Sequence, residues 1–331
     1  MNRIIIADAI DGLRQIDDES VDTCITSPPY FNLRDYGSEN QIGLEKTPEE
    51  YIDRLVEVFR EVKRVLKSDG TLWVVIGDCY AGSGKGRMKD GTHSTDKSKS
   101  SDYANIVGGH LTKTTAKGCK VKDLIGIPWM LAFALRTDGW YLRNNIIWNK
   151  PNVMPESVKD RCTCCHEHIF LLSKKRKYFF DKVAIEEPAR PDGRKDTYFK
   201  GSGKYKQDPL VPGNRPQSHH IQGRPHERWR TKNGVHVRNK RNVWTIPTKA
   251  YKGAHFATFP PDLVKPCVLA GSRVGGIVLD PFAGSGTVAM VAQECGRQYI
   301  AIEINPQYKP LIEERLREEV ADGEHSQSDR G

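Results

Sequence analysis

The sequence contains no long apolar run, and nowhere reaches the roughly 18 consecutive apolar residues that span a bilayer. We also expect no signal or transit peptide, because Met1 leads at once into the strand-like Ile4-Ile5-Ile6. We therefore expect a cytoplasmic protein that does not bind membranes. Of its 331 residues, 37% are hydrophobic and 28% are charged, which is typical of a soluble chain with one large α/β domain or two domains.

The eight cysteines lack the dense, even spacing of a secreted disulfide framework, so we expect them to be reduced thiols. Three of them lie in the cluster Cys162-Thr163-Cys164-Cys165-His166. Zinc sites commonly combine two cysteines with a second pair of ligands, and no second pair is evident here. The sequence therefore predicts no metal site.

The complete G-x-G-x-x-G fingerprint of dinucleotide-binding proteins is also missing. A shorter glycine loop follows an apolar strand near the end of the chain, Asp280-Pro281-Phe282-Ala283-Gly284-Ser285-Gly286-Thr287. Gly284 and Gly286 leave room for a ligand close to the backbone. Glu303 lies nineteen positions after Gly284, at the end of the predicted strand Tyr299–Ile302, where an acid reaches ribose hydroxyls. A ligand with a ribose and no pyrophosphate fits this loop, and S-adenosylmethionine is such a ligand.

A second loop, Ser27-Pro28-Pro29-Tyr30, follows the predicted buried strand Val21–Ile25. Its prolines fix φ and carry no N–H, so the chain leaves the sheet with a backbone carbonyl free to accept a hydrogen bond. Tyr30 offers a flat apolar face. We interpret this loop as a pocket for a planar base, whose exocyclic amine donates to the Ser27 side chain and the Pro28 carbonyl. Taken alone, so short a string fits a plain strand end equally well.

Together the two loops resemble the β-class amino-methylating DNA methyltransferases, in which a Ser/Asp-Pro-Pro-Tyr motif precedes the glycine-rich cofactor motif. Gly139–Trp148, His166–Leu172 and His255–Pro260 also resemble stretches of that family. The resemblance covers nearly the whole chain. It implies a Rossmann-like, doubly wound α/β methyltransferase sheet with circularly permuted motif order, S-adenosylmethionine as the cofactor and double-stranded DNA as the substrate.

The resemblance also assigns roles to matching positions. The catalytic loop is Ser27, Pro28, Pro29 and Tyr30, and the cofactor-binding residues are Asp8, Phe259, Asp280, Phe282, Gly284, Gly286, Thr287 and Glu303. For Asp8, an N-cap of the predicted helix Ala9–Ile16 fits equally well. For Phe259, a plain core position is an equal alternative.

Which atom is methylated depends on two further features. The chain has no Pro-Cys nucleophile motif, which disfavours methylation at carbon 5 of cytosine. In the resembled family, serine at the first loop position is typical of cytosine-N4 enzymes and aspartate of adenine-N6 enzymes, so Ser27 favours cytosine N4. Both side chains accept a hydrogen bond from either amine, so adenine N6 stays open as an alternative.

Two alternative functions from other classes also stay open. A non-catalytic DNA-binding protein on a methyltransferase fold is disfavoured by the intact catalytic loop and Glu303. A methyltransferase that modifies RNA or protein amines shares the pocket but explains the basic insertion described next less well.

Acidic residues are scarce in one segment of the chain. The net charge is +9, and between Arg190 and Arg241 there are fourteen Lys and Arg against four Asp and Glu, an excess of ten. A basic patch concentrated in one insertion is expected of a surface that binds the phosphate backbone. We therefore predict that residues 184–241 recognise the DNA target, with a solvated linker as the alternative.

The remaining patterns set the predicted domain organisation. Further helices are predicted at Pro48–Leu66, Ile125–Thr137 and Gln307–Glu319, and further strands at residues 2–8, Thr71–Ile76, Leu142–Trp148, Phe170–Ser173 and Tyr178–Phe180. Gly, Ser, Thr and Lys dominate Ala81–Lys122, which predicts a flexible loop. We expect a catalytic half (1–183), the insertion (184–241), a cofactor-binding half (242–320) and a flexible tail (321–331). A homodimer and a cognate restriction endonuclease are candidate partners.

Overall fold

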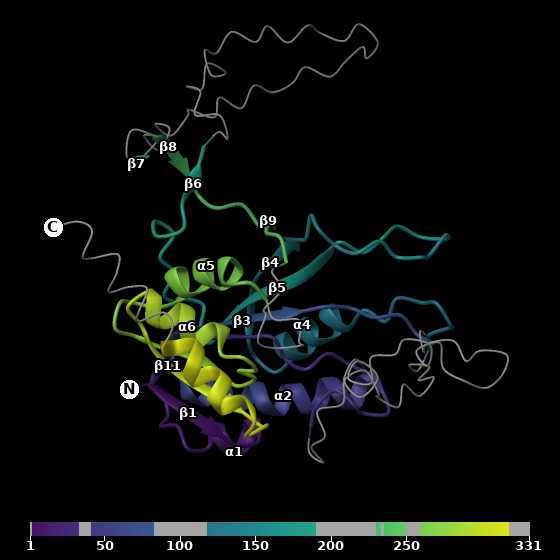
Figure 1. Ribbon diagram of the computed structural model, residues 1–331, viewed down its shortest axis with the longest axis horizontal. Helices are drawn as coiled ribbons and strands as arrows, with labels where there is room; N and C mark the ends of the chain where they lie inside the picture. Colours follow the sequence, from purple (N-terminus) through teal and green to yellow (C-terminus); the bar gives the residue numbers. More distant parts are fainter. Residues whose placement is uncertain are drawn as a thin grey trace, which may run out of the picture. The chain divides into compact units, whose positions relative to one another are not determined.

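The computed structural model, drawn in Figure 1, describes residues 2–32, 41–82, 118–189, 230–232, 235–248 and 259–317. The chain divides into two compact units. One consists of Met1–Asp181 and Asn242–Gly331, and the other is Lys182–Arg241. The predicted insertion 184–241 lies within the bounds of the second unit, and its role in target recognition stays a prediction.

The larger unit is built on an eight-stranded sheet with the order β1-β11-β10-β2-β3-β5-β4-β9. The strands are β1 (Arg3–Ile6), β2 (Val21–Thr26), β3 (Leu66–Ile76), β4 (Tyr141–Asn149), β5 (His166–Ser173), β9 (Val243–Thr245), β10 (Ile277–Asp280) and β11 (Gln298–Glu303). Strand β5 runs antiparallel to β3 and β4, and the other neighbouring pairs are parallel. Because late strand β10 pairs with early strand β2, the predicted Rossmann-like sheet with permuted motif order is confirmed.

Helices cover both faces of this sheet (Figure 1). On one face, α1 (Ala9–Leu13), α2 (Pro48–Val65) and α4 (Ile127–Thr137) share a buried core with sheet residues such as Leu72 and Phe170. On the other face, α5 (Pro261–Gly271) and α6 (Thr287–Glu294) pack together, and helical residues 308–317 reach the start of α6. Helix α5 lies so close to the sheet that a Cβ on Gly271 would be 2.8 Å from Trp73 Nε1.

The prediction of α2 succeeds because its local signals agree. Apolar residues recur at helical spacing, Pro48 stands in the first turn, and Thr47 and Glu50 form a capping box. The helix ends at Val65, one residue before the predicted end. Strand β3 starts at Leu66 rather than Thr71, because Leu66 pairs with Val21 across an irregularity in the ladder.

Some predicted elements differ in the structure. Helix α1 is three residues shorter than Ala9–Ile16. The predicted strand Tyr178–Phe180 is wrong: Phe179 N donates to Asp69 O at 2.8 Å, and the Phe180 ring stacks on Trp73 with centroids 6.3 Å apart. These aromatic residues pack a loop against the core instead of extending the sheet.

The smaller unit contains the antiparallel sheet β6-β8-β7, with β6 (Glu187–Pro188), β7 (Arg230–Lys232) and β8 (Val235–Arg238). Glu187 forms ion pairs with both Arg238 and Arg241. Burial raises the pKa of its carboxyl, but the two arginines outweigh that effect and the pKa is lowered. Most of the predicted flexible loop (83–117), most of the basic segment (190–229) and the predicted tail (321–331) lie outside the described residues. None of the described helices is long and apolar enough to cross a membrane.

Candidate active site

The two loops singled out in the sequence lie next to each other at the carboxyl edge of the sheet. The catalytic loop follows β2, the glycine loop follows β10, and these strands are parallel neighbours. Thr26 Oγ1 donates to Asp280 Oδ1 at 2.6 Å, and both side chains are buried. This bond joins residues 254 positions apart, and it brings the loops together.

Asp280 anchors the start of the glycine loop. Its Oδ1 atom also accepts from Phe282 N at 3.0 Å, which holds the half-buried Phe282 directly after the strand. Burial raises the pKa of Asp280 to about 7; the bonds from Thr26 and Phe282 lower it, and the Glu303 charge raises it further. Asp280 therefore fixes the geometry of both loops.

Glu303 holds the glycine loop from the next strand. Its Oε2 atom accepts from Gly284 N at 2.8 Å, and its Oε1 atom accepts from Asn305 N at 2.9 Å. Burial raises the pKa of this carboxyl, and the backbone N–H groups oppose that shift. A carboxylate oxygen accepts more than one hydrogen bond, so these contacts leave room for the predicted bond to ribose hydroxyls, which stays a prediction.

The two glycines of the loop differ in what surrounds them. Gly284 has a φ of +52°, and a Cβ there would meet no described atom within 4 Å. Gly286 has a φ of +78°, and a Cβ there would lie 2.8 Å from Ile312 Cγ2. Gly284 thus borders open space in which a ligand fits, whereas Gly286 allows the close approach of residues 308–317.

Thr287 is engaged by a buried arginine that the sequence interpretation missed. Arg315 Nη1 donates to Thr287 Oγ1 at 3.0 Å and to Ser285 Oγ at 2.9 Å, and Arg315 is 7% exposed. An arginine in an amphipathic terminal helix gives no sequence signal that distinguishes this buried position from a solvated one. The Thr287 hydroxyl therefore helps to fix the loop, and its role in cofactor binding stays a prediction.

Two of the predicted cofactor residues, Asp8 and Phe259, lie outside the glycine loop. Asp8 follows β1, and its Oδ1 atom accepts from Ile10 N at 2.9 Å, so the residue is the N-cap of α1. Phe259 is half-buried and lies just before α5, while residues 255–258 of the same motif lie outside the described residues. Roles for both residues in cofactor binding remain predictions.

The catalytic loop is held by residues from several elements. Tyr51 of α2 donates to the Pro29 carbonyl at 2.8 Å. Gly77, directly after β3, lies against the Tyr30 ring, where a Cβ would be 2.9 Å from Cε2. The Pro28 carbonyl has no hydrogen-bond partner among the described residues, which leaves it as an acceptor for a ligand.

Tyr30 also belongs to a chain of polar contacts. Its hydroxyl donates to Glu167 Oε2 at 2.7 Å. Glu167 Oε1 forms an ion pair with Lys150 Nζ, which lies 4.3 Å from the centroid of the Trp148 ring. Burial, followed by the Glu167 charge, raises the pKa of Tyr30 well above its usual range, so the phenol keeps its proton.

No group of three metal-ligating side chains occurs among the residues that the structure describes. Cys162, Cys164 and Cys165 are exposed free thiols.

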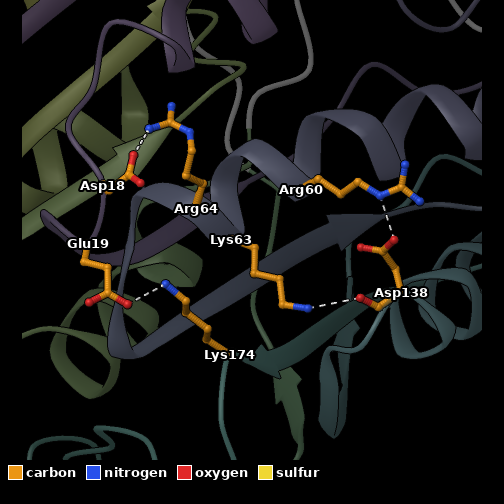
Figure 2. Close-up of a pocket in the computed structure, with 7 residues that line it drawn as sticks. All are labelled: Asp18, Glu19, Arg60, Lys63, Arg64, Asp138 and Lys174. Atoms are coloured by element: carbon orange, nitrogen blue, oxygen red, sulfur yellow. Dashed lines mark hydrogen bonds and ion pairs between the residues drawn. The ribbon is translucent and has the colours of Figure 1, made fainter.

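A charged groove lies at the amino edge of the sheet, away from both loops. Figure 2 shows the side chains that line it. Its volume is about 850 Å³, and charged side chains line it: Asp18, Glu19, Arg60, Lys63, Arg64, Asp138 and Lys174. Its cations have partners within the groove, such as Arg60 with Asp138 at 2.7 Å and Lys174 with Glu19 at 3.0 Å. The groove is therefore a network of ion pairs that joins elements of the fold.

Comparison with known protein families identifies the family to which the chain belongs. A family model described as DNA methylase, of the N6/N4 type, matches residues 21–314 and so includes both loops. The chain belongs to the DNA methylase family. The N6/N4 type agrees with the resemblance seen in the sequence, which is therefore confirmed.

Close relatives of this DNA methylase are bacterial. The chain is 44% identical to the type II methyltransferase M.SmaI of Serratia marcescens, over 95% of this chain and 90% of the relative. It is 45% identical to the type II methyltransferase M.Cfr9I of Citrobacter freundii, over 94% of this chain and 86% of the relative.

Solved structures share the fold at lower identity. The PvuII DNA methyltransferase, described as cytosine-N4-specific, matches with a TM-score of 0.60 and 18% identity, over 95% of this chain and 86% of that one. A putative DNA modification methylase from Thermus thermophilus, solved in complex with S-adenosyl-L-methionine, matches with a TM-score of 0.54 and 22% identity, over 97% and 96% of the two chains.

Proposed function

We propose that this DNA methylase transfers a methyl group from S-adenosylmethionine to the exocyclic N4 amine of a cytosine in double-stranded DNA. The observation that carries the proposal is the buried hydrogen bond between Thr26 and Asp280, which places the Ser27–Tyr30 loop beside the glycine loop. A base held by the first loop then faces a cofactor held by the second. Family membership and S-adenosylmethionine as the predicted cofactor agree with this arrangement.

The residues around the glycine loop fit the cofactor. Open space beside Gly284 admits a ligand close to the backbone, and the buried Glu303 carboxylate lies at the end of the neighbouring strand. S-adenosylmethionine supplies an electrophilic methyl group on its sulfonium. In our proposal Glu303 accepts hydrogen bonds from the ribose, while Asp280 and Phe282 keep the loop in place.

The catalytic loop holds the base. An amine inside a duplex is engaged in pairing, so the base has to leave the stack, which costs a few kcal/mol. The Ser27 hydroxyl and the Pro28 carbonyl then accept the two N–H groups of the amine, and the Tyr30 ring stacks on the base. Positioning of the amine supplies most of the acceleration, because the nitrogen lone pair is aimed at the methyl group.

The choice of cytosine rests on Ser27. In the resembled family, serine at this position is typical of cytosine-N4 enzymes. The Ser27 hydroxyl and the Pro28 carbonyl present two acceptors to the amine, and after transfer the amine loses one proton to solvent to give the neutral N4-methyl product.

The biological setting follows from the relatives. M.SmaI and M.Cfr9I are type II methyltransferases, so we infer that this enzyme is the modification component of a restriction–modification system with a cognate endonuclease. We assign target recognition to residues 184–241, whose basic composition suits the phosphate backbone. A cytoplasmic location and a homodimer complete the proposal.

Transfer of tritium from labelled S-adenosylmethionine to DNA tests the proposed activity. Wild-type protein should label DNA from a host that lacks this modification. Ser27→Ala and Tyr30→Ala should reduce the rate by about 100-fold or more, because misplacement of the amine by about 1 Å costs that much. Arg60→Gln, in the remote charged groove, is the control and should be as active as wild type. Folded wild-type protein that binds but never labels varied DNA would favour a non-catalytic binder.

A further inference from the structure

The Tyr30 side chain is held at both ends. Its hydroxyl, at the far end of the ring, donates to Glu167 Oε2 at 2.7 Å. The backbone at its near end is fixed by Tyr51 of α2, which donates to the Pro29 carbonyl at 2.8 Å. A hydrogen bond to an ionised carboxylate is stronger than one between neutral groups. The bond to Glu167 therefore restrains the part of the ring that lies farthest from the backbone.

Gly77 makes room for this bond. It directly follows β3, and a Cβ there would lie 2.9 Å from Tyr30 Cε2 and 3.5 Å from Glu167 Cδ. A methyl group at this position would push the ring away, because 2.9 Å is closer than two carbon atoms pack. The ring and the carboxylate can therefore meet because residue 77 has no side chain.

Glu167 is itself held by the neighbouring strand. It lies on β5, opposite Trp148 of β4. Lys150 Nζ forms an ion pair with Glu167 Oε1 and lies 4.3 Å from the centroid of the Trp148 ring. The side chains of Lys150 and Glu167 are both 16% exposed, and Trp148 Nε1 donates to Ile246 O at 2.8 Å. Contacts of this kind lock the rotamer of the carboxylate and make it a firm anchor for the Tyr30 hydroxyl.

We propose that Glu167, fixed by Lys150, and Gly77 are positioning residues that hold the Tyr30 ring where the target base stacks on it. They act through the ring and make no contact with the base. The inference rests on the proposed function of the catalytic loop, in which Tyr30 stacks on the base. Because misplacement by about 1 Å can cost about 100-fold in rate, the position of the ring affects methyl transfer.

Three single changes disturb the ring in different ways. Glu167→Ala removes the partner of the hydroxyl, and Tyr30→Phe removes the hydroxyl but keeps the ring. Gly77→Ala pushes against the ring. Each should lower the single-turnover rate of methyl transfer by about tenfold. The rate is measured at saturating DNA and S-adenosylmethionine, so that weaker binding of either does not contribute.

Glu167→Gln is the conservative variant. Lys150 only donates, so the amide oxygen of glutamine accepts from Lys150 and its NH₂ group donates to the Tyr30 oxygen. The ring therefore keeps its anchor, and the rate should stay within about threefold of wild type. A rate as low as that of Glu167→Ala would show that the carboxylate charge matters in itself, which contradicts a role that acts through the ring.

The double variant Glu167→Ala/Tyr30→Phe tests whether Glu167 acts through Tyr30. Either single change breaks the same hydrogen bond, so the double variant should be within about threefold of each single variant. Independent roles would instead multiply to about 100-fold. Glu19→Ala is the matched control and should keep the wild-type rate, because Glu19 forms an ion pair with Lys174 at 3.0 Å in the remote charged groove.

Crystal structures of the variants show the position of the ring without reference to activity. The Tyr30 ring should move by about 1 Å or occupy more than one position in Glu167→Ala and Gly77→Ala, and it should stay in place in Glu167→Gln. A ring that stays in place in both alanine variants overturns the positioning role, as do multiplicative effects on the rate, even if the enzyme methylates DNA.

Failure of the proposed function gives a different result. Absence of methyl transfer by folded wild-type protein overturns that function, and the crystal structures then show on their own whether Glu167 and Gly77 position the ring. Thermal unfolding and S-adenosylhomocysteine binding show whether each variant is folded. If Glu167→Ala does not fold, Tyr30→Phe and Gly77→Ala keep the test decisive, because both leave the ion pair between Glu167 and Lys150 intact.

Discussion

Thr26 is the residue on which the contact between the two loops depends. Its hydroxyl donates to the buried Asp280 carboxyl, and valine has no hydroxyl with which to form that bond. Thr26→Val should therefore lower the free energy of unfolding by about 1–3 kcal/mol and reduce methyl transfer at least tenfold. Chemical denaturation and the tritium assay measure these two effects.

Thr23→Val is the matched control for this prediction. Thr23 is a buried residue on the same strand, and it is hydrogen-bonded to Thr71 rather than to the glycine loop. The variant should also lose stability, but it should keep its activity. Equal activity in Thr23→Val and Thr26→Val would show that the bond to Asp280 does not position the loops.

Asp280 makes stability depend on pH. Its pKa is raised from 3.8 to about 7 in the folded protein, so the folded state binds the proton more tightly than the unfolded state. The contribution of Asp280 to stability is therefore complete below about pH 4 and is lost as the pH rises through about 7, by up to roughly 4 kcal/mol.

Asp280→Asn isolates this effect because asparagine does not titrate. The free energy of unfolding of wild type, minus that of Asp280→Asn, should fall between pH 4 and pH 7. Urea denaturation at a series of pH values gives this difference. A difference that stays constant or rises over this range would contradict an elevated pKa.

At the scale of elements, the two glycines of the glycine loop have different roles: Gly284 borders the space for the ligand, and Gly286 packs against Ile312. Gly284→Ala places a methyl group in open space at a φ of +52°, so it should cost only about 1 kcal/mol of backbone strain while the affinity for S-adenosylhomocysteine falls about tenfold. Gly286→Ala adds a clash with Ile312 to the strain at a φ of +78°, so it should lower the free energy of unfolding by about 2–4 kcal/mol. Calorimetric titration and denaturation distinguish the two. Equal loss of stability in both variants would contradict this division.

Elements with consistent local signals were predictable from the sequence. Helix α2 combines helical spacing with a capping box, and β2 and β10 end in loops of distinctive composition. Helix α5 was missed because Pro261 and Pro266 indicate a break, although proline suits the first turn of a helix. The predicted strand Tyr178–Phe180 was wrong because aromatic residues favour strands, whereas here Phe180 stacks on Trp73 from a loop.

The contacts of Glu167 were not predictable from the sequence. The stretch that contains it matched the resembled family, but Tyr30 lies 137 positions earlier. Their contact depends on the insertion of antiparallel β5 between β3 and β4, which no local pattern specifies. Arg315 was missed for the same reason, because its burial depends on how residues 308–317 pack against α6.

For the whole molecule, the sheet order explains how loops far apart in the sequence form one site. Strands β10 and β2 come from opposite ends of the chain and lie side by side in the sheet. The basic segment lies in the separate unit Lys182–Arg241, which interrupts the chain of the larger unit. The permuted order was predictable from the motifs, whereas the assignment of cytosine as the target base depends on Ser27 alone.

The separate unit leads to a prediction about DNA binding. Replacement of residues 184–241 by a short Gly-Ser linker should leave S-adenosylhomocysteine binding intact, because Gly284 and Glu303 belong to the other unit. DNA affinity should fall at least tenfold and become less dependent on salt, because up to fourteen cations are lost. Fluorescence anisotropy at several salt concentrations measures both. Unchanged DNA binding would support a passive linker.

The identity of the modified nucleoside tests the central claim most directly. DNA methylated by the wild-type enzyme is digested to nucleosides and analysed by mass spectrometry, with DNA treated by Ser27→Ala as the blank. The proposed function predicts N4-methylcytosine and no N6-methyladenine above the blank. N6-methyladenine without N4-methylcytosine would contradict the assignment of cytosine N4 as the target.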